Sequence, residues 1–230
     1  MKLLHIRCSP RARGAHSTRL AQAIVERLCA LHPATQVQLR DLAAEPLPHV
    51  DEDYAELLAG KLTAGTTGAT DAPTGAQARS DALIAELAQA DAIVLGTPMH
   101  NFTVPSVLKA WIDHVLRIHR TFAPTPEGGK RGLLRDRPVY IALASGGLML
   151  GERARQPDFL TPYLRAVFQT MGLHDLHFVV LQATVRGPDA VAAAWDAALR
   201  EVAQLQAVQA LPALSTLQPA APQAAALAPT

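Results

Sequence analysis

The stretch from Asp91 to Asp113, DAIVLGTPMHNFTVPSVLKAWID, decides the fold of this chain. Its apolar segment Ala92–Leu95 has the composition of a buried parallel strand, and Gly96-Thr97-Pro98 ends that strand. Pro105 begins a helical pattern, and one face of that helix gathers Val104, Leu108, Trp111, Ile112 and Val115. A loop therefore follows the carboxyl end of a buried strand, which is where open α/β sheets bind ligands.

Size and composition describe a chain that can form one full hydrophobic core. It has 230 residues, of which 49% are hydrophobic. Its 21 basic and 20 acidic residues leave a net charge of +1, which indicates neither a nucleic-acid partner nor an acidic docking surface. No segment has the length and apolar character of a membrane span, and Arg7 interrupts the short apolar start, so we expect no signal peptide. A disulfide between Cys8 and Cys29 is one alternative, but two free thiols in a reducing cytoplasm are the preferred interpretation.

Strands alternate with helices along most of the chain. Apolar segments predict further strands over 3–6, 36–39, 139–143 and 178–181, and helical spacing predicts helices over about 17–31, 51–58, 77–89, 159–171 and from 188 onward. This alternation predicts an α/β fold: a flavodoxin-like five-stranded parallel sheet of order 2-1-3-4-5 with helices on both faces. The glycine fingerprint of the six-stranded dinucleotide-binding order is absent after the first strand, and so is a phosphate-loop lysine motif.

Three segments fall outside this pattern. Proline and glycine predict a long loop over 121–137, and Gly, Thr and Pro predict a mobile surface excursion over 60–75. The Ala/Pro-rich composition of 208–230 predicts a disordered tail. We therefore expect one domain over residues 1–207, followed by that tail.

The order 2-1-3-4-5 brings the loops after strands one, three and four to one edge of the sheet. The first of these loops, SPRARGAHST (Ser9–Thr18), enters a helix whose free N–H groups can hold a phosphate without a lysine. Ser9, Ser17 and Thr18 add hydroxyl donors, and Arg11 or Arg13 adds charge. The alternative is that Ser17 only caps the helix; the convergence of three loops favours the phosphate.

The other two loops offer groups suited to a flat ring. In the loop Pro98–Phe102, Met99 and Phe102 present apolar surface, while Asn101 and the backbone N–H groups present hydrogen bonds. His100 is a candidate proton donor, although a lone loop histidine is more often only solvated. In the loop Ala144–Gly147, paired glycines allow a close approach of the backbone to a ligand. Ordinary turns are the alternative for both loops.

Other kinds of catalytic site are not indicated. The histidine pairs His114/His119 and His174/His177 have no cysteine or carboxylate partner at ligand spacing, so we expect no metal site. The GxSxG motif of a serine nucleophile is absent. Cys8 lies beside the first loop, where a helix N-terminus favours a reactive thiolate, but a buried packing residue is the preferred interpretation.

Four segments carry a resemblance to a known family. They are the loop and helix start from Ser9 to Leu20, RDLAAEPLP (Arg40–Pro48), PMHNFTVPSVLKAWID (Pro98–Asp113) and TPYL (Thr161–Leu164). With them the chain resembles the FMN-dependent NADH-azoreductase family, kin of the flavodoxin-like NAD(P)H:quinone reductases, from Met1 to about Leu205. The resemblance implies non-covalently bound FMN in a cytoplasmic homodimer with a shared active site.

The resemblance also implies roles for individual residues. Ser9 and the turn Ala15-His16-Ser17 would bind the FMN phosphate. Pro98, Met99, His100, Asn101 and Phe102 would line the isoalloxazine ring. Ala144, Ser145, Gly146 and Gly147 would lie along its pyrimidine end. Phe122 and Phe159 would sit over the ring, partly from the partner subunit.

The chain departs from the family pattern at four places, one of which is the stretch 60–75, longer and looser than the family leads us to expect. Ala15 stands where many members have a hydroxyl, and His100 replaces the usual tyrosine. Ala144-Ser145 stands where members often have serine or threonine followed by arginine. The last three departures concern the phosphate donors and the stabilisation of the ring's N1/O2 edge.

The reaction that the resemblance implies is a two-electron ping-pong transfer. NADH or NADPH would give hydride to flavin N5, and a quinone or azo compound would then take the two electrons in the same cleft. Two rivals stay open: a one-electron carrier of flavodoxin type, which a net charge of +1 does not suit, and an FMN-binding regulatory module without turnover. The sequence does not distinguish NADH from NADPH, or a quinone from an azo acceptor.

Overall fold

The computed structural model describes residues 1–58 and 75–208. Its main sheet has five parallel strands: β1 (Lys2–Arg7), β2 (Gln36–Asp41), β3 (Ala92–Pro98), β6 (Val139–Ala144) and β7 (Leu176–Leu181). Their order is β2-β1-β3-β6-β7, which confirms the predicted flavodoxin-like order. The predicted excursion over 60–75 and the predicted tail from 208 lie, apart from Gly75 and Val208, outside the described residues.

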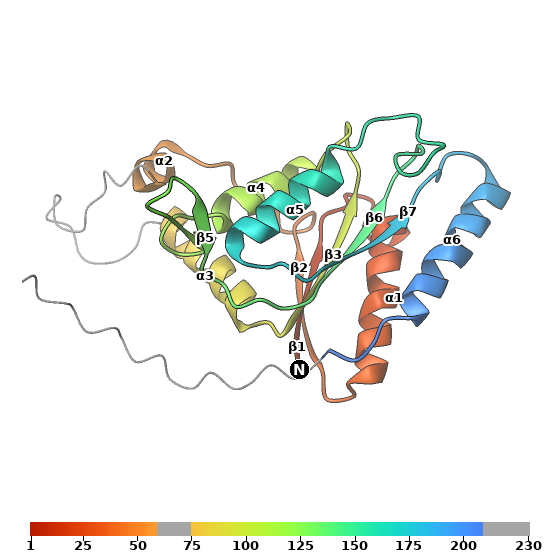
Figure 1. The fold of residues 1–230 in the computed structure, drawn as a ribbon, viewed down its shortest axis with the longest axis horizontal. Helices are drawn as coiled ribbons and strands as arrows, with labels where there is room; N and C mark the ends of the chain where they lie inside the picture. Colours follow the sequence, from red (N-terminus) through yellow and green to blue (C-terminus); the bar gives the residue numbers. More distant parts are fainter. Residues whose placement is uncertain (59–74, 209–230) are drawn as a thin grey trace, which may run out of the picture.

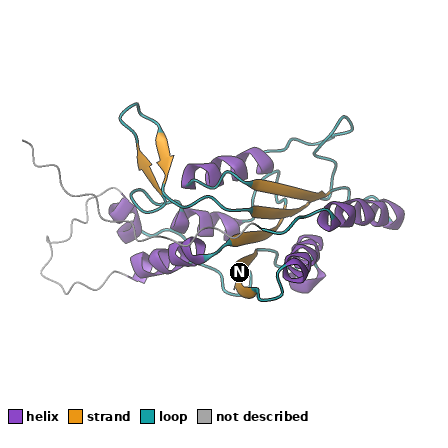
Figure 2. Ribbon diagram, turned by 60° about the horizontal axis from the view of Figure 1, so that its bottom comes forward, coloured by secondary structure: helices purple, strands orange, loops and turns teal. Residues whose placement is uncertain are grey.

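Helices cover both faces of this sheet (Figures 1 and 2). One face carries α1 (His16–Leu31) and α6 (Pro188–Ala203), and the other carries α3 (Gly75–Gln89), α4 (Ser106–Val115) and α5 (Leu160–Met171). A short helix, α2 (Glu52–Leu58), lies beside α3. Within the described ranges, no helix has the length and apolar character needed to cross a membrane.

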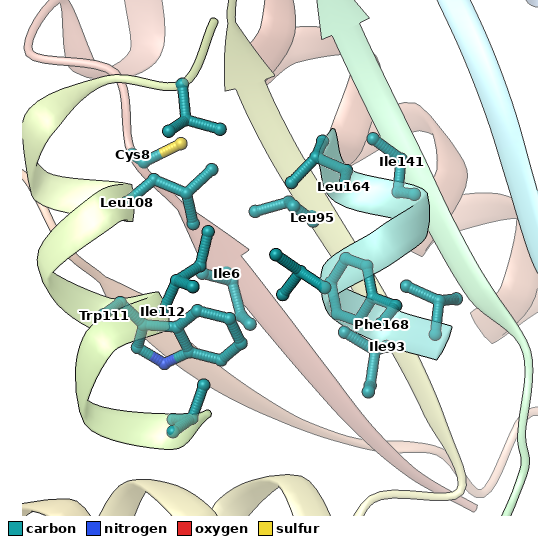
Figure 3. Packing of buried hydrophobic residues seen from close by; sticks show 14 of the residues in the cluster. Ile6, Cys8, Ile93, Leu95, Leu108, Trp111, Ile112, Ile141, Leu164 and Phe168 are labelled. Carbon is teal, nitrogen blue, oxygen red and sulfur yellow. The ribbon is translucent and has the colours of Figure 1, made fainter. Parts of the chain in front are cut away.

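The larger of two hydrophobic clusters lies between the sheet and α3, α4 and α5. Figure 3 shows Trp111, Ile112 and Leu108 of α4 directed toward Ile6 of β1 and Leu95 of β3, and Phe168 of α5 beside Ile93. All of the apolar positions predicted for α4 are buried. Burial of this stripe holds α4 against β1 and β3. Because α4 begins directly after the loop that follows β3, the same packing holds that loop at the edge of the sheet.

Close approach of α1 to β3 depends on Gly96. A Cβ at this position would lie 2.8 Å from Ala21 Cβ and 3.0 Å from the Ser17 carbonyl oxygen. The absence of a side chain therefore lets the first turn of α1 lie against the carboxyl end of β3. This contact brings the first and second loops together.

Two predictions about elements are wrong. Residues 121–137 are not only a loop, because they contain the antiparallel hairpin β4 (Phe122–Pro124) and β5 (Lys130–Gly132). Its strands have three residues each, too few for a period-two pattern, and Gly128 with φ +82° completes the turn between them. For α6, helical spacing in the sequence predicts an apolar face through Val191, Trp195, Leu199 and Val202; Val202 is buried together with Ala198, whereas Leu199 is exposed.

Candidate functional site

Three strand-end loops converge on one pocket of about 180 Å³. It lies at the carboxyl ends of β1, β3 and β6, as the strand order predicts. Its lining residues are Ser9, Pro10, Arg11, Ala15, His16, Ser17, Pro98, Met99, His100, Ala144, Gly146 and Thr184. Three larger hollows, of about 490, 500 and 390 Å³, lie at the amino ends of β6 and β7, along α1, and between the loop after β6 and Gln182. None of these three gathers the loops at the carboxyl ends of β1, β3 and β6, so the smaller pocket is the better candidate site.

The first loop delivers the N-terminus of α1 to this pocket. Ala15, in extended conformation (φ −80°, ψ 139°), is the N-cap residue, and α1 begins at His16. The interpretation of Ser17 as an N-cap is therefore wrong, because Ser17 and Thr18 lie within the first turn. Their buried hydroxyl oxygens have no hydrogen-bond partner among the described residues.

These unsatisfied groups fit an anion. The first N–H groups of a helix have no intrahelical acceptor, and the helix dipole favours negative charge there. Ser9 is buried on the same wall of the pocket, and Arg11 supplies a positive charge at its rim. A phosphate monoester is the ligand that this donor set suits best.

The second loop has an unusual backbone. His100 and Thr103 exchange two hydrogen bonds, of 2.9 and 3.0 Å, across a two-residue turn. Asn101 and Phe102 form that turn with φ of +48° and +71°, the left-handed region that a phenylalanine rarely adopts. Phe102 is 44% exposed as a result, and neither Phe102 nor Asn101, which were both predicted to line the site, is among the residues that line the pocket.

The third loop is bonded to the second. The Met99 amide donates to the Ala144 carbonyl oxygen at 2.8 Å, and the buried Ser145 hydroxyl lies 3.8 Å from Met99 Sδ. The carbonyl oxygens of Gly146 and Gly147 accept hydrogen bonds from the loop after β7. Within the described ranges, the amide groups of these two glycines have no acceptor, so they are available to a ligand.

Two contributors to the site were not predicted. Gln156 Nε2 donates to Ser145 Oγ at 2.9 Å and lies 3.1 Å from Met99 Sδ, and a Cβ at Gly147 would collide with the Gln156 amide. Nothing local in the sequence indicates this contact. Thr184 follows β7, and its amide and hydroxyl both donate to the Ser145 carbonyl oxygen at 3.2 Å. The position of Thr184 at the end of a fifth parallel strand was a signal that could have identified it.

Phe122 and Phe159, the two aromatic residues expected over the ligand, do not line the pocket. Phe159 is 60% exposed, and its amide donates to the Phe102 carbonyl oxygen at 3.2 Å, which places it beside the second loop but not among the residues that line the pocket. Phe122 lies in the β4–β5 hairpin and does not line the pocket. In Figure 1 this hairpin lies away from the carboxyl ends of β3 and β6.

Cys8 is a packing residue, as preferred from the sequence. It is fully buried, its thiol donates to the Gly96 carbonyl oxygen at 3.1 Å, and burial raises the pKa of the thiol to about 12. Cys8 and Cys29 are both free thiols. Across the part of the chain that the structure describes, no three His, Cys, Asp or Glu residues are grouped to hold a metal ion.

Comparison with known proteins places this geometry in a family. The model of the flavodoxin-like fold family matches residues 1–205. FMN-dependent NADH:quinone oxidoreductase 4 of Pseudomonas fluorescens is 52% identical over 196 residues, which cover 85% of this chain and 91% of that protein. FMN-dependent NADH:quinone oxidoreductase 5 of Burkholderia lata is 43% identical, with 88% and 93% covered. The crystal structure of an azoreductase from Bacillus anthracis superposes with a TM-score of 0.76 at 29% identity, covering 88% of this chain and 97% of that one.

Proposed function

Because this chain belongs to the flavodoxin-like fold family, to which 205 of its residues align, we propose that it is an FMN-dependent NADH:quinone oxidoreductase. The single observation that carries the proposal is the pocket at the carboxyl ends of β1, β3 and β6, which the start of α1, with the unpartnered Ser17 hydroxyl, lines together with the second and third loops. A phosphate and a flat ring have complementary places there. Relatives with this activity are similar over most of the chain.

The residues that would hold FMN divide into three groups. Ser9, the backbone of Ala15, His16 and Ser17 would hold its phosphate, with Arg11 adding charge. The second-loop residues Pro98, Met99, His100, Asn101 and Phe102 would hold the ring. The third-loop residues Ala144, Ser145, Gly146 and Gly147 would hold the polar edge of the ring. When bound, FMN supplies two-electron hydride chemistry.

The protein's own part in that chemistry is positioning and electrostatics. The unpaired amide groups of Gly146 and Gly147 can stabilise negative charge beside them. Phe102, Phe159 and Val185 expose apolar surface on loops next to those that line the pocket, which suits a flat hydrophobic acceptor such as a quinone or an aromatic azo compound. His100 is exposed, and we propose it only as a proton donor to that acceptor.

Steady-state kinetics test this function against its rivals. We expect NADH oxidation that depends on added FMN and on menadione, with parallel double-reciprocal lines, and a slower rate with an azo dye. Transfer of single electrons to a redox protein without reduction of menadione would indicate a carrier of flavodoxin type. Tight FMN binding without any turnover would indicate a regulatory module.

We propose that the active form is a homodimer in which each site is completed by the other subunit. Its support is the exposed apolar rim of Phe102 and Phe159, together with the placement of Phe122 outside the pocket of its own chain. In this proposal Phe122 covers the ring bound by the second copy. Light scattering should give twice the chain mass, and Phe122→Ala should raise the KM for menadione without changing the mass.

We also propose that the protein acts in the cytoplasm. Two free cysteines, one fully buried and one partly exposed, suit a reducing compartment. Fractionation of the native cells with a specific antibody tests this assignment.

A further inference from the structure

A hydrogen bond outside the loops links the pocket to α6. Trp195 of α6 lies 179 positions from His16 along the chain, and its indole Nε1–H donates to His16 Nδ1 at 3.1 Å. The two ring centroids are 6.0 Å apart, and the guanidinium of Arg19 lies 4.7 Å from the indole centroid. Figure 1 shows α1 and α6 side by side on the same face of the sheet. Trp195 itself does not line the pocket, whereas His16 does.

This bond decides the tautomer of His16. An indole nitrogen only donates, so His16 Nδ1 must present its lone pair to it. A neutral imidazole then carries its single proton on Nε2. Protonation of Nδ1 would set two N–H groups against each other, so the indole also opposes the charged form of His16.

Surrounding charges act in the same direction. Burial lowers the pKa of His16, and the positive charges of Arg19 on α1 and Arg11 in the preceding loop lower it further. On α6, the other helix packed against this residue, the exposed carboxylates Asp189 and Asp196 do not contribute to that shift. His16 is therefore a neutral donor at physiological pH.

We propose that Trp195 is a positioning residue for the cofactor site: it holds His16 as the neutral Nε2–H tautomer, ready to donate to the phosphate of FMN. The proposal rests on the proposed function, because FMN is the ligand it concerns. It assigns a role in the pocket to a side chain that lies outside it. It also predicts that FMN affinity in the native protein varies less with the charge of this histidine than in a protein that lacks the indole donor.

The first test is the titration of His16 in the FMN-free protein, followed by NMR of the imidazole protons. In Trp195→Phe the indole donor is gone, so the pKa of His16 should rise by about one unit. Leu199→Ala, an exposed change one turn further along α6, should leave the pKa unchanged. An identical pKa in the native protein and in Trp195→Phe would overturn the proposal.

The second test is a double-mutant cycle on FMN affinity, measured by flavin fluorescence. At pH 8, Trp195→Phe should weaken FMN binding roughly five-fold, and the deficit should shrink toward pH 6, where the freed His16 becomes charged. The phosphate's own ionisation cancels in this comparison because both proteins meet the same ligand at each pH. In a His16→Ala background, Trp195→Phe should have no further effect. His16→Gln should retain affinity, because its amide can accept from the indole and still donate.

The outcomes separate this inference from the proposed function. Equal weakening by Trp195→Phe in the native and His16→Ala backgrounds would show a general packing effect and overturn the inference alone. Failure of the native protein to bind FMN at all would overturn both the proposed function and the inference.

Discussion

His5 lies buried in β1, and its titration makes the stability of the fold depend on pH. Burial first, and the charge of Arg7 second, lower its pKa from 6.5 to about 4. Between these values the unfolded chain binds a proton that the folded chain does not, so this contribution to stability is complete above pH 6.5 and is lost as the pH falls toward 4. The loss at pH 4 is at most roughly 3 kcal/mol.

Replacement of His5 by asparagine should remove that dependence. We expect the free energy of unfolding of His5→Asn, measured by urea denaturation, to fall less steeply than that of the native protein between pH 6.5 and 4. A constant loss of stability caused by the substitution would shift the whole curve of unfolding free energy against pH without changing its slope, so it does not affect this comparison. Parallel curves for the two proteins would contradict the assignment.

Gln156 holds the third loop against the second through Ser145 and Met99. We expect Gln156→Ala to weaken FMN binding by up to about ten-fold while changing the melting temperature of the FMN-free protein little, because Gln156 is half-exposed and outside the core. Gln38→Ala, an exposed change on β2, is the matched control and should leave FMN affinity unchanged. Unaltered affinity in Gln156→Ala would show that this contact does not order the pocket.

At the scale of single residues, the sequence predicts which loops carry the site better than what each side chain does. The residues of the three loops were predictable because their chain positions follow directly from strand ends. The alternative of Ser17 as a cap is wrong because helix start signals do not distinguish the cap from the first turn. Gln156 contacts Ser145, 11 positions away along the chain, and Trp195 contacts His16, 179 positions away. No local sequence pattern encodes either contact.

At the scale of elements, the position of α1 depends on the missing side chain at Gly96. A methyl group there would meet Ala21 and the Ser17 carbonyl group, so α1 must move outward. We expect Gly96→Ala to cost about 1–3 kcal/mol of stability and to weaken FMN binding, because the same turn of α1 lines the pocket.

Gly75→Ala is the control for this change, since a Cβ there would meet nothing within 4 Å. It should leave both the unfolding free energy and FMN affinity close to native. A Gly96→Ala protein with native stability and affinity would mean that α1 is not held by this contact.

The β4–β5 hairpin shows why one element escaped prediction. It is stabilised by its place on α5 rather than by its own sequence, because Gly132 packs so closely on Gly172 that a Cβ would collide with the backbone there. By contrast, α1, α3 and α4 were predicted well because long apolar stripes mark their buried faces. Short elements that depend on distant partners carry no such mark.

At the scale of the whole molecule, the order of the strands determines which loops come together to form the site. The alternation of strands and helices predicts a parallel sheet, and the order β2-β1-β3-β6-β7 sets the loops of β1, β3 and β6 next to one another. Assembly with a second copy does not follow from this pattern, because it concerns exposed aromatic residues such as Phe102 and Phe159, whose exposure the order of strands does not predict.

Titration of the FMN-free full-length protein with FMN, followed by absorption and flavin fluorescence, tests the account most directly. We predict a yellow protein that binds one FMN per chain, with binding weakened when Asn101 or Gly146 is replaced. A protein that stays colourless at saturating FMN would contradict it.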